Sequence, residues 1–172
     1  MPLAVTHVLI AIILVDLYRD YFTRHKDLFS LHTILVAGFA GLLPDIDIPL
    51  NWFLDLFGIT VDLFQHGGIT HTPFFGLLFI IPGLVAIKLG KDKLSRYFFV
   101  MCAGVLIHLA LDLVSGGGNG HILVFWPFSM VSYKIGLYAL IGIPNLAEGV
   151  DAIILLAWLY HEEVKHKIID FI

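Results

Sequence analysis

The sequence predicts an all-α membrane protein, a polytopic bundle of about five transmembrane helices with shorter segments at the membrane interface. Hydrophobic residues make up 59% of the 172 residues, and the mean hydropathy is +0.92. Soluble domains are usually about 45–50% apolar. Charged residues amount to only 14%, against about 25% in such domains. Apolar runs approaching the ~30 Å thickness of a hydrocarbon core recur along the chain, so residues 1–172 are expected to form one membrane-embedded domain.

The first two expected spans are separated by a short polar loop. Leu3 to about Tyr21 is apolar and long enough to cross a bilayer. No basic segment or cleavage site marks it as a removable signal peptide, so we expect it to remain as a helix. Residues 31–43 form a second, shorter run rich in Ala and Gly, as is common in packed membrane helices. Pro44 is a natural terminator for it.

A loop rich in aspartate follows the second span, from Pro44 to His71. Asn51–Phe64 within it is amphipathic and aromatic, which predicts a short helix lying in the membrane interface. The third span is expected at Pro73–Leu89 and the fourth at Tyr97–Val114.

The last third of the chain is less regular. The sequence leaves His121–Ile143 open between an extended segment and a short interfacial helix. A final helix is expected from Pro144 through Trp158, with a polar end. The Gly-rich residues 116–120 lack the Lys-Ser or Lys-Thr of a phosphate-binding P-loop, so they are expected to make a tight exit from the fourth helix.

The distribution of Lys and Arg predicts the orientation. Of the ten, Lys134 alone falls outside three segments, which are the first loop and the third loop, with the span ends beside them, and the C-terminal tail. Cytoplasmic loops carry the excess of basic residues, so these three segments are expected inside. The N-terminus is then outside and the C-terminus inside, in the cell (inner) membrane, and the Asp-rich loop faces the extracytoplasmic side.

This topology brings four histidines and three aspartates to the outer face. His108 and Asp112 are spaced i and i+4, so they share one face of the fourth helix. Ionisable residues in membrane segments are costly and are usually functional. Imidazole and carboxylate groups are suitable ligands for zinc or a similar divalent ion, and seven of them suffice for two ions with a position left open for water. The candidate metal ligands are His7, Asp45, Asp47, His66, His71, His108 and Asp112.

Each of these residues also has a plain structural interpretation. His7 fits a hydrogen-bonded core histidine, and the two aspartates after Pro44 fit turn or cap residues. His108 and Asp112 fit a pair that bond to each other. Their joint placement on one face is what favours a metal site. Three further residues, His121, Glu148 and Asp151, are candidates to supplement the site, whereas His25, His161 and His166 are expected to be solvated and Asp16 to pair with Arg19.

Other classes are disfavoured. Cys102 is the single cysteine, so the chain has no disulfide framework and no cysteine-based metal site. The net charge of −4 with few Lys and Arg argues against nucleic-acid binding. The expected partners are therefore the lipid bilayer and a small amphiphilic substrate, and the sequence leaves the oligomeric state open.

Several of these segments resemble a known family. Leu43–Asp47, His66–Thr72 and His108–Asp112, together with Thr6-His7 before them and Trp126-Pro127 after a Gly-rich loop, occur in the order of the YdjM/YbcI-type inner-membrane proteins. That family is described as membrane-bound metal-dependent hydrolases and is thought to be distantly similar to zinc-dependent phospholipase C and the S1/P1 nucleases. The resemblance implies metal ligation by His7, Asp45 with Asp47, His66 or His71, and His108 with Asp112.

Two positions depart from the patterns of these relatives. The family usually has Arg after the first histidine of its H-R-G-x-T-H-S motif, and this chain has Gly67. The zinc phospholipases also carry a His-x-x-x-Glu pattern on their last helix. Here only Glu148 and Asp151 stand in that region.

The leading functional hypothesis is a membrane-bound, zinc-type hydrolase holding one to three ions. Such an ion lowers the pKa of bound water and polarises an ester oxygen. Asp47 or Asp45 is the candidate general base. A site at headgroup level suggests a phosphoester of a lipid or another amphiphile as the substrate. The alternatives are an ion or metal transporter, although no internal repeat is visible, and a membrane protein that binds metal only for stability.

Overall fold

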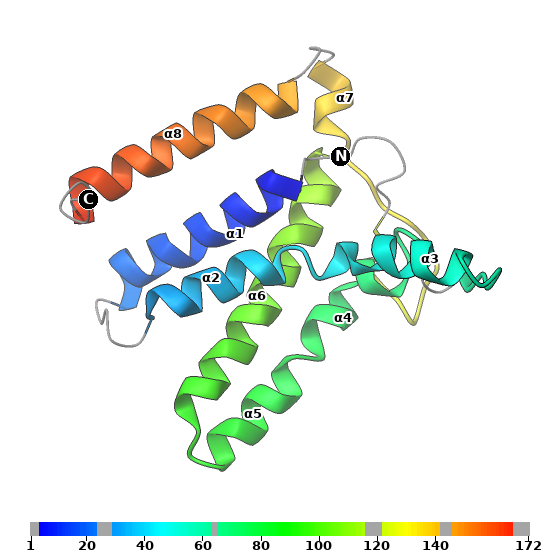
Figure 1. Cartoon of the computed structure of the whole chain (residues 1–172), viewed down its shortest axis with the longest axis horizontal. Coiled ribbons are helices and arrows are strands. Elements are labelled where there is room, and N and C mark those ends of the chain that lie inside the picture. Colours follow the sequence, from blue (N-terminus) through cyan, green and yellow to red (C-terminus); the bar gives the residue numbers. More distant parts are fainter. Residues whose placement is uncertain (1–3, 24–28, 63–64, 116–121, 142–145, 167–172) are drawn as a thin grey trace.

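The computed structural model describes residues 4–23, 29–62, 65–115, 122–141 and 146–166, and these are mainly helical. Figure 1 shows two groups of helices that diverge from a common region. The α-helices are α1 (Ala4–Tyr18), α2 (Leu31–Ala40), α3 (Asp47–Asp55), α4 (Pro73–Leu77), α5 (Ile80–Lys88), α6 (Asp92–Ser115), α7 (Leu137–Ile141) and α8 (Leu146–His166). The all-α prediction is confirmed for the described residues.

Three short helical turns connect these helices. A π-helical turn, η1 (Arg19–Thr23), continues α1. The 3₁₀ turn η2 (Pro44–Ile46) leads into α3, and the 3₁₀ turn η4 (Ile69–His71) leads into α4. The last two supply several of the predicted ligands, so the site depends on short turns as much as on long helices.

Helix α6 is the central element. It packs against α1, α2, α4 and α5, while α8 packs along α1. Small residues allow the close approach of α2 and α6. A Cβ atom on Gly104 would lie 2.7 Å from both the Ala37 carbonyl oxygen and the Ala40 Cβ. Glycine at this crossing therefore lets the two backbones meet, as in other tightly packed membrane helices.

Two clusters of apolar side chains fill the interior. One is built from Val15, Ile34, Ala37 and Val100, at the contact of α1, α2 and α6. The other contains Val105, Leu109 and Ile122 and lies nearer the end of α6. Polar residues are buried beyond this second cluster, which is where the candidate ligands lie.

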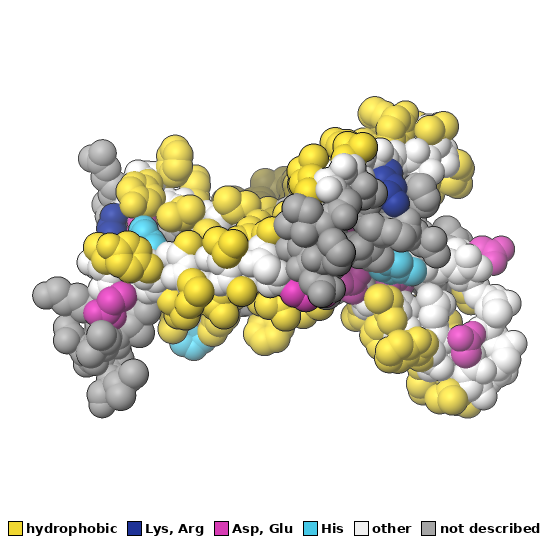
Figure 2. Space-filling model, turned by 90° about the horizontal axis from the view of Figure 1, so that it is seen from above, with side chains coloured by type: hydrophobic (Ala, Val, Ile, Leu, Met, Phe, Trp, Pro, Cys, Tyr) yellow, Lys and Arg dark blue, Asp and Glu magenta, His cyan; other side chains and the backbone are white. Residues whose placement is uncertain are grey.

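Large apolar side chains also remain on the outside. Phe39 is 73% exposed and Leu156 is 66% exposed. Hydrophobic side chains spread along much of the face seen in Figure 2. Apolar surface on this scale is unusual for a soluble monomer and suits contact with lipid.

The five expected spans are not confirmed as such. Among the described residues, α6 is the one helix that is both long and apolar enough to cross a membrane alone. The pair α2 and 44–55 reaches that length only together, across a bend of 53°. Helix α1 has 15 residues, about 22 Å at 1.5 Å per residue, and the segment Pro73–Lys88 is likewise short of a full span.

The boundaries of the interfacial helix were predicted wrongly. The expected helix was Asn51–Phe64, whereas α3 runs from Asp47 to Asp55. It begins earlier because the Pro44 turn leads directly into it, and it ends before Gly58, which has a φ of +67°. Phe64 itself lies outside the described residues.

Two other segments match their predictions more closely. The third expected span is a broken helix, α4 and α5, with the break at Leu78 and Phe79. The break precedes Pro82, which lacks the N–H that would bond the Leu78 carbonyl. In the segment 122–141, both open alternatives occur: Ile122 and Tyr133 pair as an isolated antiparallel bridge, and α7 follows.

Candidate metal centre

Four separate segments bring ionisable side chains to one buried point. These are the first turns of α1, the turn η2, the end of η4 and the last turns of α6, which meet where the two helix groups of Figure 1 converge. They supply, in that order, His7, Asp45, His71, and His108 with Asp112. All except Asp45 have side chains no more than 2% exposed.

Local sequence fixes the positions of the two turns. Pro44 opens η2 and restricts its own φ, which places Asp45 directly after the end of α2. At η4, Thr72 caps the next helix by accepting a hydrogen bond from the Phe75 amide at 3.2 Å, and its hydroxyl donates to the Ile69 carbonyl. Pro73 follows at the first helical position. His71 is thus held one residue before a capped helix start.

The ligand-type atoms face one another at short range. Nε2 of His108 lies 3.2 Å from Asp112 Oδ2, and Nε2 of His7 lies 3.3 Å from Asp112 Oδ1. Nε2 of His71 lies 3.4 Å from Asp45 Oδ1 and 3.8 Å from Asp112 Oδ2. Ligands held about 2.0–2.1 Å from a tetrahedral zinc ion are themselves about 3.3 Å apart. The observed spacing therefore fits ligands arranged around a common ion.

Several of these atoms are buried without a hydrogen bond among the described residues. They are Asp45 Oδ1, His71 Nε2, His108 Nε2 and both carboxylate oxygens of Asp112. Buried polar atoms are nearly always hydrogen-bonded, and leaving one without a partner costs about 1–3 kcal/mol. A cation at their shared centre would satisfy all of them, so the donor set fits a metal ion.

The tautomer of His108 supports this fit. Its Nδ1 lies 2.7 Å from the carbonyl oxygen of Gly41, which can only accept, so Nδ1 carries the proton and donates. Nε2 then presents its lone pair to the centre. A histidine that ligates a metal usually makes this kind of hydrogen bond with its other nitrogen. A Cβ on Gly41 would lie 2.9 Å from the His7 carbonyl oxygen, so glycine also permits the contact between α1 and α2 here.

Asp47 does not face the shared centre as Asp45 does, but contacts the far side of the His71 ring. Its Oδ2 is 3.2 Å from Nδ1 of His71, on the opposite side of the ring from the Nε2 atom that faces the centre. The same oxygen accepts from the Thr70 hydroxyl, and Oδ1 lies 3.2 Å from Nδ1 of His66. The structure thus places Asp47, predicted as a ligand and as a base, where a carboxylate orients ligating histidines.

His66 is the most exposed of the predicted histidines, at 24% of its side chain. Its ring meets His71 edge-on with centroids 4.6 Å apart. Ligand atoms of Asp45, His66 and His71 all fall within 4.8 Å of one another, as do those of His7, His108 and Asp112. Two adjacent sets of three ligands are therefore present, which is compatible with more than one ion.

The electrostatics of the centre are dominated by its carboxylates. Burial alone would lower the pKa of His71, but its contacts with Asp45 and Asp47 outweigh this and raise the pKa to about 9. The metal-free form is therefore protonated at His71 near neutral pH. A metal ion must displace that proton to bind.

An apolar hollow opens beside Asp45. It has a volume of about 530 Å³, and its lining includes Ala4, Phe39, Leu42 and Trp52 besides Asp45 itself. Of the five converging residues, Asp45 is the one with appreciable exposure, at 21% of its side chain. The centre is thus closed on the α6 side and reachable on the Asp45 side.

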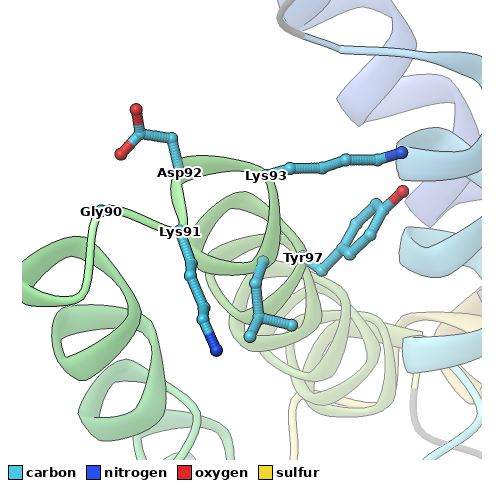
Figure 3. Close-up of a pocket in the computed structure, with 6 residues that line it drawn as sticks. Gly90, Lys91, Asp92, Lys93 and Tyr97 are labelled. Carbon is cyan, nitrogen blue, oxygen red and sulfur yellow. The ribbon is translucent and has the colours of Figure 1, made fainter.

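Figure 3 shows a second hollow of similar size, at the turn between α5 and α6. It is lined by Gly90, Lys91, Asp92, Lys93, Leu94 and Tyr97. Asp92 precedes His108 by 16 residues on one helix, about 24 Å at 1.5 Å per residue. This basic hollow is therefore remote from the metal centre.

A model of one protein family matches residues 1–167. The chain belongs to the YdjM inner membrane protein family. This confirms the resemblance proposed from the motifs and supports a membrane location. No curated protein and no solved structure gives a match.

The structure places the supplementary candidates Asp151 and Glu148 differently with respect to the centre. Asp151 accepts a hydrogen bond of 2.5 Å from the hydroxyl of Thr6, the neighbour of His7, so it lies at the edge of the centre. Glu148 is exposed, and His121 lies outside the described residues. Sequence reasoning did not identify Gly41, whose backbone carbonyl leaves no motif, or Thr70, whose position inside the histidine stretch was the available signal.

The predictions for the inner histidines and Asp16 also had mixed outcomes. Asp16 pairs with Arg19 at 2.6 Å, as predicted. His161 was expected to be solvated, but its side chain is only 24% exposed and it faces Asp20, so that prediction was wrong. Solvation failed as a prediction because α8 folds back along α1. His25 lies outside the described residues, and the surroundings of the His166 side chain are not described.

Proposed function

We propose that this protein is a membrane-embedded, metal-dependent hydrolase with a zinc-type centre formed by His7, Asp45, His71, His108 and Asp112. The convergence of buried, unsatisfied imidazole and carboxylate atoms from four segments carries the proposal. Structural zinc sites usually close with four ligands, whereas catalytic sites keep a position for water. The exposed edge at Asp45 supplies such a position.

The residues divide the chemistry among them. When bound, the ion lowers the pKa of a bound water toward about 7 and polarises the ester oxygen. Asp45 lies at the open edge and is placed to accept a proton from the attacking water. Asp47 holds His71 and His66 by their Nδ1 atoms and so fixes the direction of Nε2 of His71. The Gly41 carbonyl does the same for His108.

The substrate that suits this arrangement is a phosphoester of a lipid or another amphiphile. Its apolar part would lie in the hollow lined by Phe39, Leu42 and Trp52, with the ester at Asp45. A phosphoryl group would complement a cationic centre. Concave, mostly apolar surfaces with a few polar groups are typical of sites for such ligands.

We further propose that the centre faces the extracytoplasmic side. The basic residues Lys88, Lys91 and Lys93 lie at the opposite end of α6 from His108. Basic segments favour the cytoplasm, which leaves the centre outside. Cysteines placed at Asp55 and at Lys91 in a Cys102→Ala background test this in intact spheroplasts. A membrane-impermeant thiol reagent should label the former, and labelling of the latter alone would reverse the orientation.

The hydrolase proposal is tested with protein purified in detergent. Elemental analysis should find a divalent ion, zinc by expectation, and its content should fall in His71→Ala and in His108→Ala but stay unchanged in His32→Ala. His32 is a matched control because it is an exposed histidine on α2, outside the centre. Hydrolysis of a short-chain phosphodiester lipid should follow metal content across these variants.

Two outcomes would contradict the hydrolase. Metal uptake into proteoliposomes without ester hydrolysis would favour a transporter, and tightly held metal without hydrolysis or uptake would favour a purely stabilising ion. Absence of stoichiometric metal from wild type would overturn the centre itself.

A further inference from the structure

A second group of potential ligands lies at the other end of α1, away from the centre. It consists of Asp16 on α1, Asp20 on η1, and His161 with Glu162 on α8. One ligand atom each from Asp16, Asp20 and His161 falls within 4.8 Å of the others. Along α1, Asp16 follows His7, a ligand candidate of the first centre, by nine residues, which is about 13 Å at 1.5 Å per residue.

Arg19 organises the carboxylates of this group. Its guanidinium contacts Oδ1 of Asp16 at 2.6 Å and Oδ1 of Asp20 at 3.1 Å. The second oxygen of Asp20 instead lies 3.7 Å from Nε2 of His161. One oxygen of each aspartate therefore contacts the same cation, and these contacts do not involve Oδ2 of either residue.

Three other atoms of this group, one each from Asp16, His161 and Glu162, are buried and unsatisfied among the described residues. Asp16 is 2% exposed, and its Oδ2 has no hydrogen-bond partner among the described residues. The same holds for Nε2 of His161 and Oε1 of Glu162. The Glu162 carboxyl adjoins that of Asp16. Asp16 and Asp20 place two carboxylates beside one guanidinium, with the Glu162 carboxyl adjacent. Buried excess negative charge is costly and is relieved by a cation.

We propose that this group binds a second divalent cation of the zinc type, held by Oδ2 of Asp16, Oδ2 of Asp20 and Nε2 of His161, with Glu162 as a further ligand. Two carboxylates and an imidazole form an established donor set for such ions. Arg19 holds the other oxygen of each aspartate and so orients both ligands. This site does not depend on the hydrolase function.

The position of the site suggests its role. Helix α8 packs along α1, and Asp151 bonds to Thr6 at one end of the pair. An apolar hollow of about 330 Å³ runs along both helices, from Ile10 and Ile154 to His161. A cation at Asp16, Asp20 and His161 fastens the other end of α8 to α1.

The decisive measurement is zinc stoichiometry in detergent, by equilibrium dialysis and elemental analysis, in two sets of variants. His71→Ala with His108→Ala disables the first centre. That protein should retain about one zinc per chain, which Asp16→Asn with His161→Ala should remove. Asp16→Asn removes the charge but keeps an oxygen that can accept a hydrogen bond from Arg19, so the contact between the two side chains is retained. Asp55→Asn, an exposed carboxylate on α3, is the matched control and should change nothing.

Two results would overturn the second site. One is that the variant without the first centre binds no zinc, and the other is that its remaining zinc survives Asp16→Asn with His161→Ala. Hydrogen exchange provides an independent readout. Added zinc should slow amide exchange in residues 154–166 of the variant without the first centre, and should have no such effect after Asp16→Asn with His161→Ala. Equal slowing with and without Asp16→Asn and His161→Ala would contradict the proposal that a cation at this site fastens α8 to α1.

Discussion

Metal binding at the centre should release a proton from His71, and Asp47 should control how much is released. His71 has a pKa of about 9 because Asp45 and Asp47 favour its charged form despite burial. At pH 8 about nine-tenths of the metal-free molecules therefore carry this proton. Zinc needs the neutral ring, so binding expels it.

The Asp47→Asn substitution isolates this effect. It removes the negative charge beside Nδ1 of His71 but keeps the shape of the side chain and an oxygen that can still accept. The pKa of His71 should then fall toward its usual value near 6.5, limited by the remaining charge of Asp45. The proton released at pH 8 should accordingly drop by up to about 0.9 per ion.

Isothermal titration with zinc in two buffers of different ionisation enthalpy measures the proton count directly. Any proton lost from metal-bound water appears in both proteins, so the difference between wild type and Asp47→Asn reports His71. The apparent Kd of wild type should rise about fiftyfold from pH 9 to pH 7, from the growing protonated fraction alone. Equal proton counts in the two proteins at pH 8 would refute the assignment of Asp47 as the partner of His71.

The raised pKa of His71 also makes the stability of the metal-free protein depend on pH. The pKa of His71 is raised in the folded state, so its pairing with Asp45 and Asp47 stabilises the fold fully below about pH 6.5. This contribution is lost as the pH rises through about 9. Zinc-loaded protein should not show the loss, because the ligand is then neutral at every pH at which zinc stays bound.

Four further variants test other parts of the structure. Asp47→Ala should weaken zinc binding at the first centre about 10- to 100-fold without abolishing it, whereas removal of a converging ligand such as His108 should abolish binding at that centre, as measured by zinc titration at pH 9. Gly104→Ala should destabilise the protein by about 1–3 kcal/mol in detergent, because its Cβ would meet the α2 backbone at 2.7 Å. Gly149→Ala is the control, because a Cβ there would meet no atom within 4 Å, and it should be neutral or stabilising by about 0.5–1 kcal/mol. Equal losses of stability in the two variants would contradict the close contact of α2 with α6 at Gly104. Gly67→Arg should lower the free energy of unfolding by about 1–2 kcal/mol, since Gly67 has a φ of +87°. It should not raise phosphodiesterase activity.

The sequence predicted the elements of this fold better than their relation to a membrane. Hydrophobic runs located α1, α2, α6 and α8 because apolar periodicity and length report helices directly. The same runs could not show that α2 stops at Ala40 and bends by 53° into the following helix. Pro44 indicated that the helix would end, but the angle of the bend also depends on the ligands gathered beside it, which is a property of tertiary structure.

The candidate site was predictable because its residues lie at the ends of apolar segments. His108 and Asp112 share a helical face by spacing alone, and loop charge placed them with His71. Which residues contact one another could not be predicted in this way. No pattern indicates that a Gly41 carbonyl would fix the tautomer of His108, or that α8 would bring His161 against Asp20.

The division between Asp45 and Asp47 follows from the turn that carries them. They stand two residues apart across η2 and the start of α3, and a 3₁₀ helix turns about 120° per residue, so their side chains leave in directions about 120° apart. One carboxylate therefore reaches the open edge of the centre and the other reaches the outer side of His71. If the turn were regular α-helix, the two side chains would be about 160° apart, and the carboxylate pair could not bracket a single imidazole as closely. The short 3₁₀ turn that begins at Pro44 thus lets two aspartates, two residues apart, take different roles. Asp45 serves as a ligand, and Asp47 orients the ligand His71.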